Sequence, residues 1–85
     1  DIKWQVYPNP SSGLFSLVYQ LNEGERLSVK VYDVNGKLAK TASTAGSGFV
    51  QKLGIDLQSP SFAPGLYLVE VMTGEKKQLF KIIKQ

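Results

Sequence analysis

The chain has 85 residues, of which 42% are hydrophobic and 20% charged, a composition that indicates one small globular domain and excludes a disordered or fibrous protein. It contains no Cys and no His, which excludes disulfides, thiolate metal sites and catalytic arrangements that use either side chain. The net charge is +3, but residues 76–85 hold four lysines and no acid, so the rest of the chain sums to −1. We therefore expect the basic character to belong to this tail rather than to a face of the domain, and we expect no nucleic-acid partner.

No apolar run approaches the ~18 residues of a membrane span and no signal peptide is visible, so we expect a chain that is not membrane-inserted. Because the sequence begins with Asp1 and not with Met, we expect a fragment or processed domain of a longer protein.

Hydrophobic residues alternate with period two along much of the chain, which predicts strands, and no segment has a sustained helical period. Proline cannot continue a sheet ladder, so Pro8-Asn9-Pro10 ends the first strand. We expect strands near residues 2–7, 14–21, 27–34, 37–41, 49–57, 65–72 and 78–84.

The sequence also predicts the conformations of the connections between these strands. Asn35-Gly36 favours a tight type I′ hairpin turn, because both central positions of that turn need a positive φ. Residues 42–48 (ASTAGSG) are small and polar, which predicts a flexible loop. Gly54 interrupts an apolar run and indicates a bulge or bend, and we expect Phe62 to be the apolar plug of a loop between two prolines.

About seven short strands in one small chain predict an all-β protein, an immunoglobulin-like antiparallel β-sandwich, with residues 1–85 forming a single domain. The alternation places Tyr19 and Tyr67 in the core between the sheets. The pairing order of the strands does not follow from the pattern.

The acidic residues do not suggest an enzyme. Acid–base catalysis needs two carboxylates held in a cleft, whereas Glu23 and Glu25 lie at a predicted turn and Glu70 points outward between two valines. The sequence around Asp33 resembles part of a calcium loop but lacks its ligand spacing and closing Glu. We interpret Asp33, with Asn35 and Gly36, as hairpin-turn residues, and we expect no metal and no cofactor.

Two surface features leave alternatives open. Trp4, Tyr7 and Tyr32 are the aromatic residues free to stack on a sugar, although a role as cover for a sheet face explains them as well. The tail lysines either block edge-to-edge aggregation or serve recognition. An exposed edge strand could also pair two copies as a weak homodimer, which the lysines oppose.

Four stretches, in order, resemble motifs of the C-terminal sorting domains of the type IX (Por) secretion system of Bacteroidetes. They are residues 6–10 (VYPNP) with Gly13, 27–37 (LSVKVYDVNGK), 64–69 (PGLYLV) and 81–84 (KIIK). Each motif is weak alone, but four in order over residues 5–84 are specific together.

The resemblance implies a sandwich that follows an N-terminal cargo protein and carries no catalytic function. It implies recognition by the type IX outer-membrane translocon, cleavage by a surface sortase in many members, and export through the periplasm to the outer-membrane surface or the medium. The recognition elements that it implies are Pro8, Asn9, Pro10, Gly13, Gly65, Tyr67, Lys81, Ile82, Ile83 and Lys84. From the residues themselves, we hypothesise that a partner with an acidic groove adds a strand along the lysine-rich last strand.

Two other classes of function remain open at this point. One is a carbohydrate-binding or adhesive β-sandwich, which exposed aromatic residues on one flat face would favour. The other is a fibronectin-like spacer module within a larger secreted enzyme.

Overall fold

The computed structural model describes residues 4–74 and 76–85. This part of the chain contains strands and turns but no helix long and apolar enough to cross a membrane. The strands are β1 (Gln5–Tyr7), β2 (Leu14–Gln20), β3 (Arg26–Tyr32), β4 (Leu38–Ala45), β5 (Val50–Asp56), β6 (Gly65–Met72) and β7 (Lys77–Lys84).

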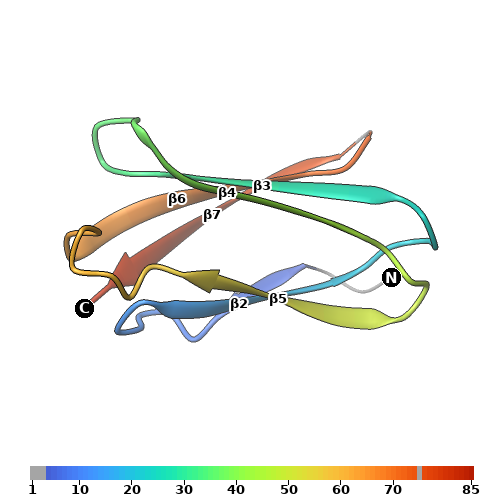
Figure 1. Cartoon of the computed structure of the whole chain (residues 1–85), viewed down its shortest axis with the longest axis horizontal. Helices are drawn as coiled ribbons and strands as arrows, with labels where there is room; N and C mark the ends of the chain where they lie inside the picture. Colours follow the sequence, from blue (N-terminus) through green and yellow to red (C-terminus); the bar gives the residue numbers. More distant parts are fainter. Residues whose placement is uncertain (1–3, 75) are drawn as a thin grey trace.

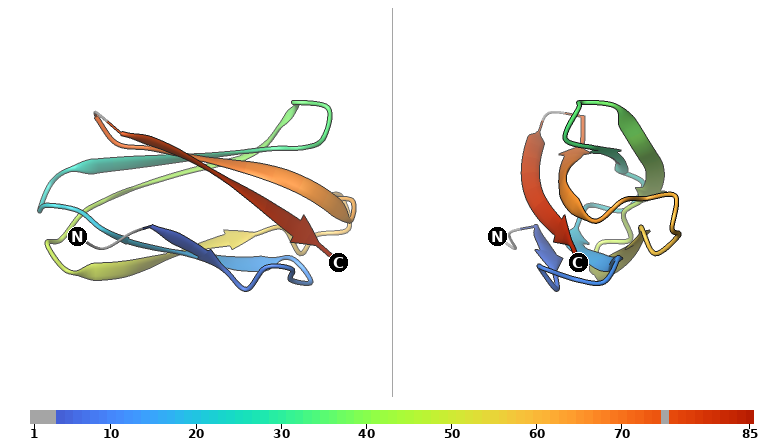
Figure 2. Two further views of the ribbon diagram at one scale, coloured as in Figure 1. Left: turned by 180° about the vertical axis from the view of Figure 1, so that it is seen from behind. Right: turned by 90° about the vertical axis from the view of Figure 1, so that its left-hand side faces the viewer.

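The strands form two antiparallel sheets, one with the order β1-β2-β5 and the other with the order β4-β3-β6-β7. Figure 1 shows the four-stranded sheet above the three-stranded sheet, and the end-on view in Figure 2 shows the two layers facing each other. The predicted all-β antiparallel sandwich is therefore confirmed. The chain changes sheet after β2, after β4 and after β5, so neighbours in sequence are often in different layers.

The core between the sheets is supplied by the alternating residues of the central strands. In β2, Phe15, Leu17 and Tyr19 are at most 1% exposed, because every second side chain of a strand points to the same face. Phe62, from the β5–β6 connection, packs against this core as expected. The other buried apolar side chains are Leu21, Leu27, Val29, Val31, Ile55, Leu57, Tyr67, Val69, Val71 and Ile82.

The prediction of a flexible loop over residues 42–48 is wrong, because the first four of these residues are the second half of β4 and pair with β3. Gly46 then donates its N–H to the Glu25 carbonyl at 2.8 Å, and Gly48 donates to the Leu21 carbonyl at 2.9 Å. A Cβ on Gly46 would lie 2.5 Å from the Cβ of Leu21. The small side chains here permit the close approach of two connections, and the backbone bonds hold them together.

The hairpin between β3 and β4 turns at the predicted place, but its turn is type I and not type I′. Gly36 donates its N–H to the Asp33 carbonyl at 3.0 Å and has a φ of +78°, whereas no described non-glycine residue has a positive φ. Oδ1 of Asp33 accepts the N–H groups of Asn35 and Lys37 at 2.9 and 3.0 Å. These bonds stabilise Asn35 in a right-handed conformation, and a type I turn followed by a left-handed glycine is a common hairpin loop.

The predicted bulge at Gly54 is also wrong. β5 pairs with β2 in an unbroken register, with Gly54 opposite Ser16, while the register shift in the other sheet lies between Val31 and Tyr32. A Cβ on Gly54 would meet no atom within 4 Å. This glycine therefore leaves the outer face without a side chain at that position and does not shift the register of the strand.

Candidate recognition site

The recognition residues implied by the family resemblance come from three distant parts of the sequence, and they meet at one end of the sandwich. Gly65, the first residue of β6, lies opposite Lys84 of β7, and Ser11 from the β1–β2 connection forms an isolated bridge with the same Lys84. Figure 1 shows this end at the left, where the C-terminus is marked and the β1–β2 and β5–β6 connections turn. We call it the motif end, and define it as residues 8–13, 64–67 and 81–85.

Asn9 attaches the β1–β2 connection to the free edge of β7. Its side-chain amide donates to the Lys81 carbonyl at 2.8 Å, and its side-chain oxygen accepts the Ile83 N–H at 3.0 Å. Ser11 donates its N–H to the Ile83 carbonyl at 3.0 Å and accepts the Gln85 N–H at 2.7 Å. Because these four backbone groups already have partners, the hypothesis that another strand adds along this part of β7 is wrong for residues 81–85.

Lys84, which the resemblance marks as a recognition element, is not accessible to a partner. Its side chain turns inward and is 7% exposed, and its Nζ donates to the carbonyls of Ser59 and Phe62 at 3.1 and 2.6 Å. Ile82, on the same face of β7, is fully buried in the core. Lys81, by contrast, is exposed. Lys84 instead joins β7 to the β5–β6 connection.

Two glycines of the motif end are required by the backbone. Gly13 has a φ of +136°, and a Cβ there would lie 2.9 Å from both the Gln58 Cα and the Leu57 oxygen. The Leu57 N–H also donates to the Gly13 carbonyl at 2.7 Å. Gly65 has a φ of +138° with open space around it, so its conformation alone favours glycine. Both residues position the strands of this end.

Tyr67 is a core residue with one polar contact, as its phase in the sequence predicts. Its side chain is 5% exposed, and its hydroxyl donates to the Ala63 carbonyl at 2.6 Å. Burial raises the pKa of Tyr67, and the negative charge of Asp33 raises it further. The phenol is therefore a neutral hydrogen-bond donor that stabilises the β5–β6 connection.

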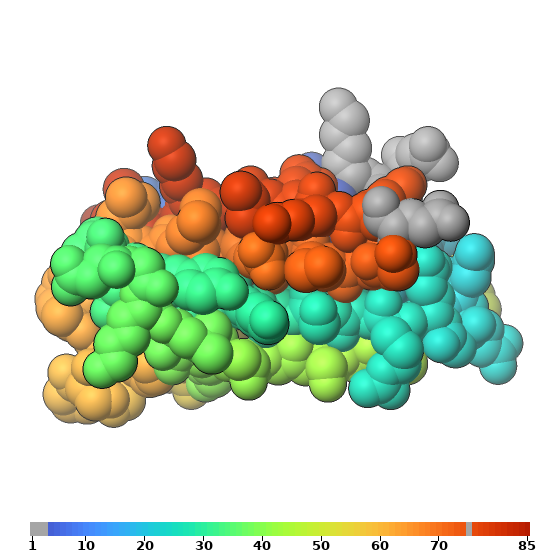
Figure 3. Space-filling model, turned by 90° about the horizontal axis from the view of Figure 1, so that it is seen from above, coloured from blue at the N-terminus to red at the C-terminus, as the bar shows by residue number. Residues whose placement is uncertain are grey.

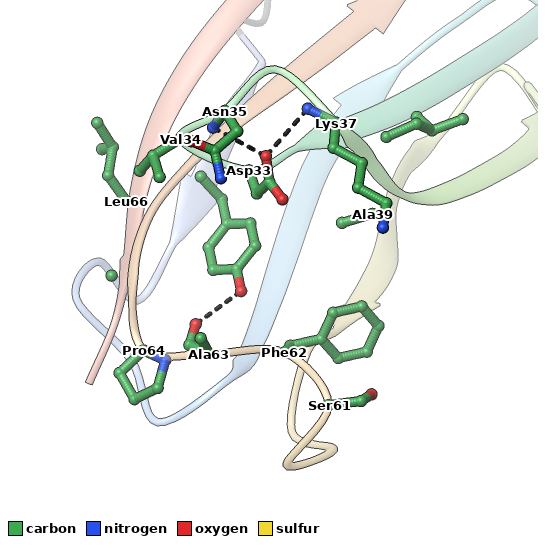
Figure 4. Close-up of a pocket in the computed structure, with 13 residues that line it drawn as sticks. Asp33, Val34, Asn35, Lys37, Ala39, Ser61, Phe62, Ala63, Pro64 and Leu66 are labelled. Atoms are coloured by element: carbon green, nitrogen blue, oxygen red, sulfur yellow. Dashed lines mark hydrogen bonds between the residues drawn. The ribbon is translucent and has the colours of Figure 1, made fainter.

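A groove of about 360 Å³ lies beside the motif end, between the β3–β4 hairpin and residues 61–67 (Figure 4). Among the described residues that line it, Asp33 is the only carboxylate, and two backbone N–H groups donate to its Oδ1. No group of three acidic, His or Cys side chains that could hold a metal ion occurs among the described residues. The groove offers an apolar surface rather than an acid–base pair, and its apolar walls are Val34, Leu38, Ala39, Phe62, Ala63, Pro64 and Leu66.

The basic charge is arranged on a face, contrary to the prediction that it belongs to the tail alone. On the outer face of the four-stranded sheet, β3 presents Arg26 and Lys30 and β7 presents Lys77 and Lys81, all exposed. Glu70 is the only acid in these strands and β6, and it pairs with Lys77 at 3.2 Å. The sequence could not indicate this face because it depends on β6 bringing β3 and β7 together.

The three aromatic residues considered for sugar stacking, Trp4, Tyr7 and Tyr32, do not form one platform. Tyr7 lies on the outer face of the three-stranded sheet, where the Lys52 Nζ is 5.7 Å from its ring centre. Tyr32 lies on the outer face of the other sheet, opposite Leu68. Trp4 is partly buried against the core. This separation removes the feature that favoured a carbohydrate-binding module.

The fold and the site define a small all-β sandwich in which hydrogen bonds join distant segments at the motif end. The sequence model of one family, the secretion system C-terminal sorting domain, matches residues 5–85, and the chain belongs to this family. No curated protein matches the chain. The protein is thus a non-catalytic C-terminal sorting domain of the type IX (Por) secretion system, destined for the cell surface or the extracellular medium.

Proposed function

We propose that residues 1–85 act as one sorting domain, and that the type IX outer-membrane translocon recognises its motif end in the folded state. A cargo protein precedes the domain, and a cell-surface sortase separates the two after export. In this proposal the translocon contacts a surface assembled from distant segments and does not read a short linear sequence.

The observation that supports this proposal is the attachment of Asn9 to β7. Asn9 and Lys81 are 72 positions apart, yet the side chain of one bonds to the backbone of the other. The same end receives Gly13 and Gly65, each in a backbone conformation suited to glycine. Residues of three motifs therefore share a site that exists only when β1, β6 and β7 are all in place.

The test is a fusion of a signal peptide and a fluorescent reporter ahead of residues 1–85, expressed in a Bacteroidetes host with and without a working type IX translocon. We expect the reporter at the surface or in the medium only in the competent strain. The same reporter without the domain is the control. Reporter retained in the periplasm of both strains would contradict the proposal.

A matched pair of variants tests the role of the motif end. Asn9→Ala removes the attachment to β7, whereas Asn22→Ala changes an exposed asparagine in the β2–β3 turn at the other end of the sandwich. We expect Asn9→Ala to lower surface delivery and Asn22→Ala to leave it unchanged. Equal delivery of both variants would count against recognition through this end.

A further inference from the structure

The motif residues of β6 and β7 lie on both faces of the sheet, because successive side chains of a strand point to opposite faces. Tyr67, Ile82 and Lys84 point inward and are 5%, 0% and 7% exposed. Leu66 and Ile83 point outward and are 44% and 47% exposed. The inward residues contact the core and the β5–β6 connection. Only the outward residues are free to contact another molecule.

The two outward apolar residues are neighbours, and a third exposed apolar side chain lies in the adjoining groove. Leu66 and Ile83 lie directly opposite each other in the β6–β7 ladder. Ile83 directs its N–H and carbonyl away from β6, to Asn9 and Ser11, so the pair is of the non-hydrogen-bonded kind, in which facing side chains are closest. Val34, 69% exposed, lines the same groove as Leu66 (Figure 4). We call these three side chains the aliphatic patch: Val34, Leu66 and Ile83.

The charge next to the paired residues Leu66 and Ile83 is positive. Lys81 precedes Ile83 by two positions, so it stands on the same face of β7, and it is exposed. The groove that Val34 lines carries one charge of each sign, Asp33 and Lys37. Figure 3 looks onto this face, with the β3–β4 hairpin in green and β6 and β7 in orange and red. A molecule that covers Leu66 and Ile83 therefore meets apolar side chains next to the ammonium group of Lys81.

The opposite sheet has exposed apolar residues without such a patch. Leu14 and Val50 are 49% and 51% exposed, close to the values of the paired residues of β6 and β7. They lie at opposite ends of the β2–β5 ladder, where Leu14 faces Asp56 and Val50 faces Gln20. Six positions along a strand separate them by roughly 20 Å. Isolated apolar residues of this kind are normal on protein surfaces and indicate no contact site.

We propose that the aliphatic patch, together with Lys81, is the surface through which this domain docks onto a protein that presents apolar side chains and a carboxylate opposite Lys81. This proposal rests on the proposed function, since it names the chemistry of the partner that reads the motif end. Leu66 and Ile83 lie on the outer face of a sheet and are each about half covered, as apolar side chains at the surface of a folded protein often are before a partner binds. Insertion into a lipid layer instead uses a broad apolar face flanked by Trp and Phe.

The test uses the reporter fusion and purified 85-residue variants. Leu66→Thr with Ile83→Thr removes the apolar pair while keeping residues that favour strands. Leu14→Thr with Val50→Thr is the control with matched exposure on the other sheet. Lys81→Glu reverses the charge beside the patch, and Lys52→Glu is its control on the three-stranded sheet. Thermal unfolding of each purified variant shows whether it is folded.

We expect the Leu66→Thr, Ile83→Thr double variant to remain folded and to lose at least about tenfold in surface delivery, the size expected when a central contact is removed. Lys81→Glu is expected to lower delivery as well, and both controls to stay within about twofold of the wild type. Folded patch variants delivered at the wild-type level would overturn this proposal. Failure of the wild-type domain to be delivered would refute the proposed function itself.

Vesicles of phosphatidylglycerol and phosphatidylcholine distinguish a lipid surface from a protein partner. We expect the purified wild-type domain to stay unbound when such vesicles are floated on a density gradient. Flotation of the wild type that is lost in the Leu66→Thr, Ile83→Thr variant would assign the patch to lipid and overturn the assignment to a protein.

Discussion

Replacing Lys84 by Met tests the attachment of β7 to the β5–β6 connection. The substitution keeps most of the buried stem but removes the ammonium group that bonds to the carbonyls of Ser59 and Phe62 at 3.1 and 2.6 Å. A hydrogen bond to a charged group contributes about 1.5–3 kcal/mol. Part of the lost hydrogen-bond energy is regained, because the variant no longer buries an ammonium group away from water and because water can bind the two freed carbonyls. We expect a net loss of about 2 kcal/mol in the free energy of unfolding, which for a domain of this size lowers Tm by roughly 8–16 °C.

Lys81→Met is the matched control, because Lys81 is on the same strand with its side chain exposed. We expect it to change stability by no more than about 0.5 kcal/mol. Urea and thermal unfolding can be followed through the fluorescence of Trp4, the single tryptophan, which packs partly buried against the core. If both lysine variants unfold at the same urea concentration, the bonds of Lys84 do not stabilise β7 and the reasoning is refuted.

Three further variants test other contacts of the motif end. Asn9→Ala should cost about 1–2 kcal/mol and speed hydrogen exchange of the β7 amide that it binds; an unchanged NMR exchange rate would argue against that bond. Gly13→Ala places a Cβ 2.9 Å from backbone atoms, so it should cost about 2 kcal/mol more than Gly24→Ala, whose φ is also positive but whose Cβ meets nothing; equal Tm values would contradict this. Burial raises the pKa of Tyr67, so its contribution to stability is complete below its unfolded pKa of 10.0 and is lost as pH rises through the folded pKa. Tyr67→Phe should therefore flatten the fall in Tm between about pH 9 and 11, and an unchanged fall would refute that cause.

Local patterns predict much of this fold because the core is built from alternating residues. Phe15, Leu17 and Tyr19 in β2 follow from period two alone, as does Tyr67 in β6. The errors occur where long-range contacts override local preference. The small residues of β4 read as a loop, yet pairing with β3 extends that strand through residue 45. The Asn-Gly pair favours a type I′ turn, but the carboxylate of Asp33 stabilises a type I turn.

The motif end was only partly predictable for the same reason. The sequence alone could have shown which residues of β7 point inward and which point outward. Side chains alternate along a strand, so a buried Ile82 places Lys84 on the core side and Lys81 and Ile83 on the outer side. The attachment of Asn9 gives no local signal, since its partner is 72 positions away. The basic outer face likewise depends on the order β3-β6-β7, which the alternating pattern does not contain.

The division of the motifs into two faces changes how a loss of sorting should be interpreted. For an inward residue such as Ile82 or Lys84, a substitution disturbs the core or the β5–β6 connection, so sorting and Tm should fall together. For Leu66, Lys81 and Ile83, sorting should fall while Tm stays near that of the wild type. Deleting residues 81–85 removes both kinds of contact at once and cannot separate recognition from folding. Point variants can separate the two effects when surface delivery is plotted against Tm. Variants of inward residues should lie on one line, on which delivery falls with Tm, and variants of outward residues should lie below that line because their delivery falls while their Tm does not.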